Sequence, residues 1–93
     1  MVELTKNSNG WPTLQVDGKE FQIIGGELHN SSASSAVYLN ETVIPAVSGL
    51  EMNTLFVPVY WELIEPTEGV YDFSSIETLL KVAREGGYRL VLL

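Results

Sequence analysis

The sequence predicts an α/β fold in which a β-hairpin precedes alternating strands and helices. Two short apolar runs, at 53–60 and 88–93, have the nearly continuous hydrophobic character of strands that are buried on both faces of a parallel sheet. The segment 74–86 between them has a helical spacing of apolar residues, and helical crossovers between such strands predict right-handed parallel connections. Doubly wound sheets and (β/α)8 barrels both begin in this way, so these runs alone leave both architectures open.

The composition excludes several classes of protein. The 93 residues include 12 acidic and 5 basic side chains, with a formal net charge of -7, and no cysteine. A disulfide scaffold and a cysteine-based zinc module both need thiols, and an acidic chain with so few cations is a poor partner for nucleic acid. No apolar run approaches the roughly 20 residues that span a bilayer, so we expect no membrane partner. A hydrophobic content of 45% instead indicates a soluble globular chain.

The beginning of the sequence predicts a polar arm followed by the hairpin. Residues 1–12 are polar and rich in turn residues. They lack the features of a secretory signal, so we expect a cytoplasmic protein. Asp17-Gly18 lies between two β-prone runs and supplies the positive φ angles of a type I′ turn. The second of these runs, 21–24, ends at a pair of glycines.

The segment after these glycines predicts an interrupted helix. Ser34 or Ser35 can cap a helix that runs through 36–39. Pro45 lacks an N–H group, so we expect either a break or a second short helix that begins near 40–42. We expect this second helix to bury one apolar face and to end at Gly49. The residues of that face are Val43, Ile44, Val47 and Leu50.

The second half of the chain predicts a strand, a loop, a helix and a strand. Pro58 cannot donate to a sheet ladder, so the strand at 53–60 should end near it. An irregular loop follows, and Ser74 with Glu77 fits a capping box at the start of the helix 74–86. Two glycines end that helix, and the expected inward residues are Ile76, Leu79, Leu80, Val82 and Ala83.

Two segments, GGELHNSSASS and VPVYWELIEPTEGVYDFS, carry a resemblance to a known family. Together with the DGKEF hairpin and the RLVLL strand, they resemble the amino-terminal part of glycoside hydrolase family 35, the β-galactosidase-like enzymes. Family 42 is similar in the pattern W-x-x-x-E-P-x-E-G-x-[YF]-D-F, which here is Trp61, Glu65, Pro66, Glu68, Gly69, Tyr71, Asp72 and Phe73. The resemblance implies a (β/α)8 TIM barrel and retaining hydrolysis of a carbohydrate by two carboxylates without a cofactor. Because such a barrel needs about 250 residues, 13–93 would be an incomplete barrel, roughly the first third of the catalytic domain.

The same resemblance implies that the catalytic glutamates lie outside this chain. In that family they follow the fourth and seventh barrel strands, whereas this sequence reaches the third. We therefore expect no catalytic residue among these 93 and no hydrolysis by them alone. Two alternatives stay open: a complete small α/β module that self-associates through the sheet edge at 88–93, and a different hydrolase on the same barrel.

Candidate substrate-binding residues follow the first two parallel strands, where active sites of this fold collect. Glu27 and Glu62 are carboxylates that can accept hydrogen bonds from sugar hydroxyls. Asn30 can bind hydroxyls or cap the next helix, and capping is the favoured role. Trp61 offers a flat apolar surface to a sugar ring. We expect the other aromatic residues of this region, Phe56, Tyr71 and Phe73, to lie in the core.

Other polar residues near these strand ends favour structural roles. His29 is the only histidine, so a metal cluster would need ligands from elsewhere, and a hydrogen-bonded structural histidine is the favoured interpretation. We expect no metal site. Glu62 and Glu65 are poorly spaced for a retaining pair, whose carboxyl groups flank the scissile bond about 5 to 5.5 Å apart. We expect Glu65 instead to tie its loop to backbone amides or to a basic partner.

Overall fold

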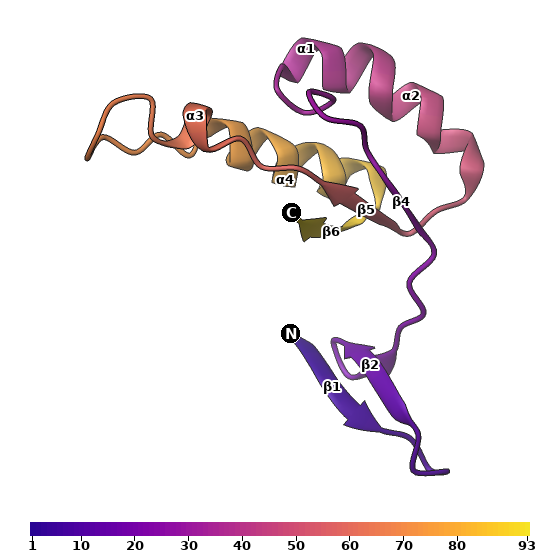
Figure 1. Ribbon diagram of the computed structural model, residues 1–93. Coiled ribbons are helices and arrows are strands. Elements are labelled where there is room, and N and C mark those ends of the chain that lie inside the picture. Colours follow the sequence, from indigo (N-terminus) through magenta and orange to yellow (C-terminus); the bar gives the residue numbers. More distant parts are fainter.

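The computed structural model describes residues 1–93 and contains two three-stranded sheets, with the helices packed on only one of them (Figure 1). The antiparallel sheet consists of β1 (Val2–Lys6), β2 (Pro12–Val16) and β3 (Lys19–Glu20). The parallel sheet consists of β4 (Gly25–Glu27), β5 (Thr54–Val57) and β6 (Arg89–Leu92). The helical segments are α1 (Ala36–Tyr38), the π-helix η1 (Leu39–Val43), α2 (Ile44–Val47), the 3-10 helix η2 (Ser48–Leu50), α3 (Trp61–Ile64) and α4 (Ser74–Gly86). The α/β class is confirmed, and the parallel sheet is open at β4 and β6 rather than closed into a barrel.

The hairpin turn forms where its sequence predicts it. Asp17 and Gly18 have φ angles of 52° and 81°, as a type I′ turn requires, and Val16 is paired with Lys19 across it. The strand after the turn is shorter than expected, because β3 has two residues and only the Phe21 N–H extends the pairing, to the Leu14 carbonyl. The rest of the expected run, 22–24, forms no strand.

The segment 1–12 contains a strand that the sequence analysis missed. All five residues of β1 pair with β2 in antiparallel register, from Val2 opposite Val16 to Lys6 opposite Pro12. The Asn7 carboxamide closes the connecting turn by accepting from the N–H groups of Asn9 and Trp11 at 2.9 and 3.1 Å. The expected polar arm is therefore largely one edge of a sheet.

The parallel strands have the order β4-β5-β6, which is also their order in the chain. The first of them, β4, begins at the glycine pair instead of ending before it. A Cβ on Gly25 would lie 2.7 Å from the Thr54 backbone oxygen, so the close approach of β4 to β5 requires glycine. The pairings Gly26 opposite Leu55 and Leu55 opposite Leu90 continue across the sheet.

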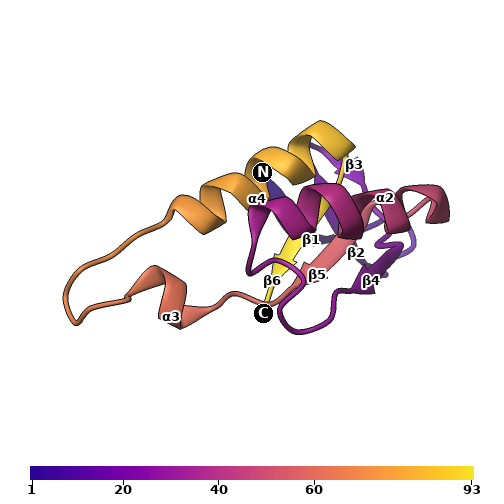
Figure 2. The ribbon, with the colours of Figure 1, turned by 90° about the horizontal axis from the view of Figure 1, so that it is seen from above.

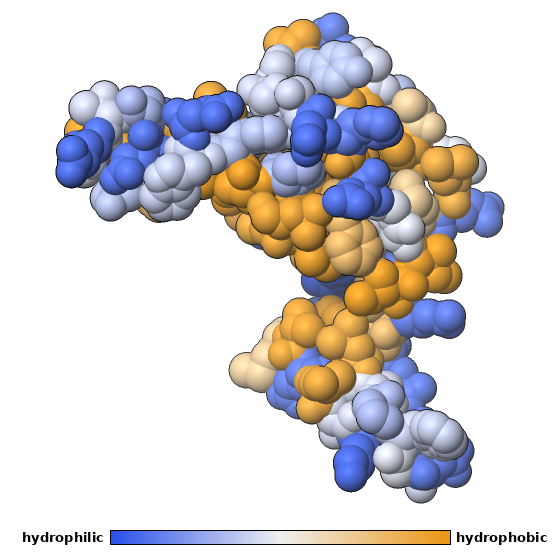
Figure 3. Space-filling model, in the orientation of Figure 1, coloured by the Kyte–Doolittle hydropathy of each residue, from blue (hydrophilic) through white to orange (hydrophobic).

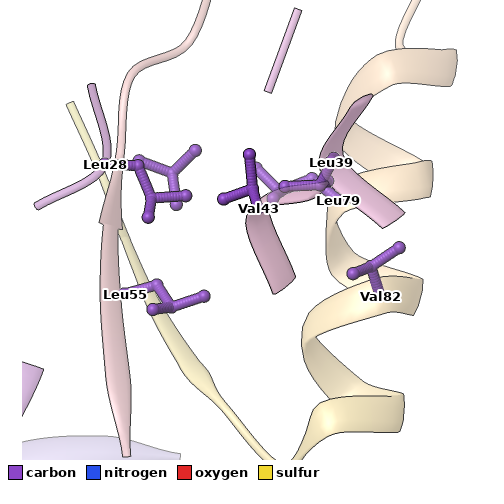
Figure 4. Packing of buried hydrophobic residues seen from close by; sticks show 7 residues of the cluster. Leu28, Leu39, Val43, Leu55, Leu79 and Val82 are labelled. Atoms are coloured by element: carbon purple, nitrogen blue, oxygen red, sulfur yellow. The ribbon is translucent and has the colours of Figure 1, made fainter. Parts of the chain in front are cut away.

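The core lies between one face of the parallel sheet and the helices (Figure 4). Leu55 and Val57 of β5 are completely buried, and each such side chain contributes about 1.5–3 kcal/mol to folding. The cluster comprises Leu28, Leu39, Val43, Leu55, Val57, Leu79 and Val82, and it includes side chains from both η1 and α4. Both crossover helices therefore cover the same face of the sheet.

The first helical run differs from its prediction at the proline. Ser35 caps α1 as predicted, and its hydroxyl accepts from the Tyr38 N–H at 3.4 Å. The helical run then continues through Pro45 without a break. Just before the proline, the π-helix η1 replaces α-helical hydrogen bonding, so that the Ile44 N–H donates to the Leu39 carbonyl, five residues earlier. The stop is also different, since the left-handed residue is Glu51 rather than the expected glycine.

Helix α4 ends as predicted but begins differently. Gly87 adopts the left-handed conformation, and its N–H donates to carbonyl groups of the last turn. The expected capping box is wrong: Ser74 is the first helical residue, and the Asp72 carboxylate accepts from its N–H at 2.9 Å. Leu80, expected inward, is 41% exposed, whereas Leu79 is buried.

The antiparallel sheet lies beyond the amino ends of the parallel strands, and apolar side chains gather on both sides of this junction (Figure 3). A hollow of about 140 Å³ remains between the two sheets, with Val16, Phe21 and Val91 among its lining. The Asp17 carboxylate accepts from the Arg89 guanidinium at 3.4 Å and thereby joins the hairpin to β6. None of the helices combines the length and the apolar character that a bilayer crossing requires.

Candidate functional site

The carboxyl ends of the three parallel strands form one edge of the sheet, named here the carboxyl edge. Glu27 is the last residue of β4, not the first after it, and is paired with Phe56 in the register. Successive side chains on a strand point to opposite faces, and the next residue, Leu28, belongs to the core on the helix side. Glu27 therefore lies on the opposite face, where it is exposed.

Asn30 and His29 follow β4 in an exposed turn. The cap of the next helix is Ser35, so the expected capping role of Asn30 is wrong, and its side chain stays free to bind another group. The His29 ring is also exposed and forms no hydrogen bond; only its backbone carbonyl accepts, from the Ser32 N–H at 3.1 Å. The expectation of a hydrogen-bonded structural histidine is therefore wrong as well.

Trp61 and Glu62 follow β5 and open the single turn α3, whose N-cap residue, Tyr60, makes no side-chain hydrogen bond to it. Both side chains are exposed. In the view from above, α3 and the loop after it extend well beyond the sheet (Figure 2). Glu27 and Asn30 thus lie at and just after the end of β4, and Trp61 and Glu62 lie in the helical turn that follows the neighbouring strand β5. The only side-chain hydrogen bond that any of these four residues makes runs from Trp61 to Glu65.

Glu65 organises the loop 61–73. Its carboxylate accepts from the Trp61 indole N–H at 3.3 Å through Oε1 and from the Gly69 backbone N–H at 3.1 Å through Oε2. The Gly69 N–H is the main reason that the pKa of Glu65 lies below its usual value, with donors on Tyr71 and Trp61 adding to the effect against partial desolvation. The prediction that Glu65 ties the loop to backbone amides is confirmed.

These contacts also bear on the possibility that Glu62 and Glu65 form a catalytic pair. In a retaining glycosidase one carboxyl must be held protonated by a raised pKa, so that it can donate a proton to the leaving group. The lowered pKa of Glu65 does not suit this acid. Both of its oxygens accept hydrogen bonds from its own loop, which does not suit the second carboxylate, the nucleophile, either. The geometry therefore argues against a catalytic pair here.

An aromatic patch, defined here as Trp61, Tyr71 and Phe73, lies on the same loop. The Trp61 and Tyr71 rings meet edge to face at 6.5 Å and 68°, and the Tyr71 and Phe73 rings stack at 6.4 Å and 13°. The expectation that Tyr71 and Phe73 belong to the core is wrong, whereas Phe56 is half-buried on β5. Their place in a loop with neither helical nor strand periodicity was a signal of exposure that the sequence analysis did not use.

A second feature that sequence reasoning missed is a hollow of about 260 Å³ beneath this loop, between α1, α3 and the start of α4. Its polar lining consists of hydroxyl groups and one carboxylate: Ser34, Asp72, Ser74, Ser75 and Thr78. Asp72 is already engaged with the Ser74 N–H. The structure brings no three His, Asp or Glu side chains close enough to hold a metal ion.

Comparison with known proteins gives one family and several curated relatives. The family model described as glycosyl hydrolases family 35 matches residues 13–92. A beta-galactosidase of Xanthomonas manihotis is 28% identical over 92 residues, which is 88% of this chain and 15% of that protein. Beta-galactosidase 17 of Arabidopsis thaliana is 37% identical over 75 residues, 81% of this chain and 10% of that protein.

A third relative, a beta-galactosidase of Macaca fascicularis, is 30% identical over 79 residues, 82% of this chain and 11% of that protein. The chain therefore aligns along most of its own length but spans only a small part of the length of these relatives.

Proposed function

The chain belongs to glycosyl hydrolases family 35, and from this premise we propose that it supplies the first β-α units of the barrel of a retaining, β-galactosidase-like glycosidase. The observation that carries the proposal is the family match over residues 13–92, which includes both crossover helices and all three parallel strands. The proposal concerns the whole protein, because the relatives are several times longer than this chain.

The arrangement of the sheet supports a barrel rather than a doubly wound fold. In a (β/α)8 barrel, each strand neighbours the next one in sequence, and all helices lie outside the sheet. The order β4-β5-β6, with both crossover helices on one face, agrees with this pattern. The other face, with Glu27 and Phe56, would then line the barrel interior, and the hairpin sheet would cover its amino end.

Four residues of this chain would contact the sugar at the carboxyl edge. Glu27 and Glu62 would accept hydrogen bonds from hydroxyl groups, and Asn30 would donate to and accept from them. The Trp61 ring would lie against the apolar C–H face of a sugar ring. The nucleophile and the acid/base glutamate would come from later strands, so these 93 residues alone would bind part of a substrate without hydrolysing it.

A second candidate function has one observation in its favour. Strand β6 pairs only with β5, so its outer edge presents unpaired backbone groups that a second copy of the chain could extend. A module that self-associates in this way would give dimers of the 93-residue chain on size exclusion with light scattering. Such dimers should disappear when a proline replaces Leu92. The N–H groups of Arg89 and Leu93 donate to residues of the β5 side, so alternation along the strand directs the Leu92 N–H to the outer edge.

The test of the proposed function uses the full-length protein that contains these residues. It should release 4-nitrophenol from 4-nitrophenyl β-galactoside, with the β-anomer of galactose formed first in a proton NMR time course. Replacing Glu27 by Gln should lower kcat/KM about tenfold to hundredfold, because a hydrogen bond to a charged group is lost. Glu3→Gln, in the exposed strand β1, is the matched control and should leave kcat/KM unchanged. Formation of the α-anomer first, or equal activity of both variants, would contradict the proposal.

A further inference from the structure

The rings of the aromatic patch contact one another and yet remain in solvent. Trp61, Tyr71 and Phe73 are 62%, 57% and 55% exposed, although each carries a large apolar surface that folding normally removes from water. Exposed apolar surface of this kind, concentrated on one loop, marks a binding site more often than scattered single residues do. The patch is therefore a candidate binding surface.

The loop holds these rings in place before any occupant arrives. The Glu65 carboxylate accepts from the Trp61 indole N–H and from the Gly69 N–H on the opposite side of the loop. The lowered pKa of Glu65 keeps this carboxylate ionised at neutral pH. Because the rings are already held, binding has less conformational entropy to overcome than binding to a mobile loop.

The shape and charge of the patch indicate a neutral carbohydrate. Tyr71 and Phe73 are stacked at 13°, and Trp61 meets Tyr71 edge to face at 68°, so the three rings adjoin one another and form one continuous aromatic surface. Sugar rings present flat C–H faces to such surfaces. The loop contains no Lys or Arg, and its charged residues are all acidic, which disfavours phosphate, sulfate and nucleic acid: Glu62, Glu65, Glu68 and Asp72.

The position of the patch connects it to the proposed substrate site. The loop follows β5 at the carboxyl edge, next to Glu27 at the end of β4 and Asn30 in the turn after it, and it projects outward from there (Figure 2). A sugar chain that enters at this edge has units beyond the one that is cleaved. The projecting loop is suited to those outer units.

We propose that Trp61, Tyr71 and Phe73 bind a sugar unit outside the catalytic position, which makes the substrate of the full-length protein a neutral oligosaccharide or polysaccharide and not merely a disaccharide. This inference rests on the proposed function, because it assumes that the carboxyl edge faces the substrate. It adds Tyr71 and Phe73 to the residues that contact sugar.

Hydroxyl-radical footprinting of the full-length protein tests the proposal without depending on catalysis. Peptide mass spectrometry should find all three rings oxidised in the free protein and protected at least threefold by β-1,4-galactotetraose. Trp11, on the hairpin, is 67% exposed and is the internal control, whose oxidation should not change. The proposal is overturned if the rings are oxidised equally with and without the tetraose. It is also overturned if they are unreactive in the free protein, because the rest of the protein then covers them.

Kinetics separate this proposal from the proposed function. Trp61→Ala should raise KM for galactotetraose about threefold to tenfold and KM for galactobiose by a smaller factor, whereas Trp11→Ala, in the exposed hairpin, should leave both unchanged. Trp61→Phe keeps a flat ring and should restore most of the loss, which a purely structural role of the indole N–H would not allow. Protection without hydrolysis would refute the proposed function but not the patch. Hydrolysis without protection would refute the patch but not the proposed function.

Discussion

The two ends of the parallel sheet are built in opposite ways. At the amino end, a second sheet lies next to the strands, apolar side chains line the hollow between the two sheets, and Asp17 and Arg89 join them. At the carboxyl edge, nothing comparable covers the strands, and the exposed residues are carboxylates, amides and aromatic rings. The same three strands thus have one end that a second sheet adjoins and one end whose polar and aromatic side chains remain exposed.

The largest expected effect comes from a change in the core that both ends share. Leu55 is completely buried between the helices and the sheet, so Leu55→Ala should lower the free energy of unfolding by about 2–5 kcal/mol. The midpoint of urea denaturation, followed by far-ultraviolet circular dichroism, measures this loss. Leu4→Ala removes the same atoms from a side chain that is 78% exposed and should change the midpoint little. Equal shifts for the two variants would mean that this core does not hold the sheet together.

A smaller effect is expected where β4 approaches β5 near the amino end. In Gly25→Ala the added methyl group would lie 2.7 Å from the Thr54 backbone oxygen, so the two strands must move apart. The expected loss is about 1–3 kcal/mol in the same denaturation experiment. Gly49→Ala is the matched control, because nothing lies within 4 Å of its added methyl group. A Gly25→Ala protein as stable as the control would show that the closeness of these strands is not needed.

The smallest effect is expected at the carboxyl edge and depends on pH. The pKa of Glu65 in the folded loop is below its ordinary value of 4.5, so the ionised carboxylate stabilises the loop above that pH. This stabilisation is lost as the pH falls through the lower, folded-state pKa. The Trp61 fluorescence should therefore stay constant from pH 7 to about pH 4.5 and change only below it, when the indole loses its acceptor. Since Asp17 and Asp72 also have lowered pKa values, the transition must be compared with that of Glu65→Gln, in which the Glu65 component should be missing.

Local chemistry explains which parts of the fold could be predicted. The Asp17-Gly18 turn, the strand before Pro58 and the end of α4 at Gly87 each follow from the backbone limits of one or two residues. Strand β1 was missed, because its pairing depends on a partner strand and its own residues are largely polar. The helix continues through Pro45 because of the π-helix η1, and no short sequence motif predicts a π-helix.

In the candidate site, too, some features could be predicted from the sequence and others could not. The placement of Glu27, Asn30, Trp61 and Glu62 at strand ends follows from the strand predictions alone, and their role in binding stays a prediction. The exposure of Tyr71 and Phe73 could not be inferred from their hydrophobicity, because it depends on how Glu65 folds the loop away from the sheet. No sequence motif predicts the conformation of the turn after β4 or the lack of a hydrogen bond to the His29 ring.

The sequential order of the strands also bears on how the protein is synthesised. Every side chain of the buried cluster comes from residues 28–82, and each strand of the parallel sheet pairs with the one made just before it. This part of the fold can therefore close as soon as β6 has left the ribosome, without waiting for distant segments.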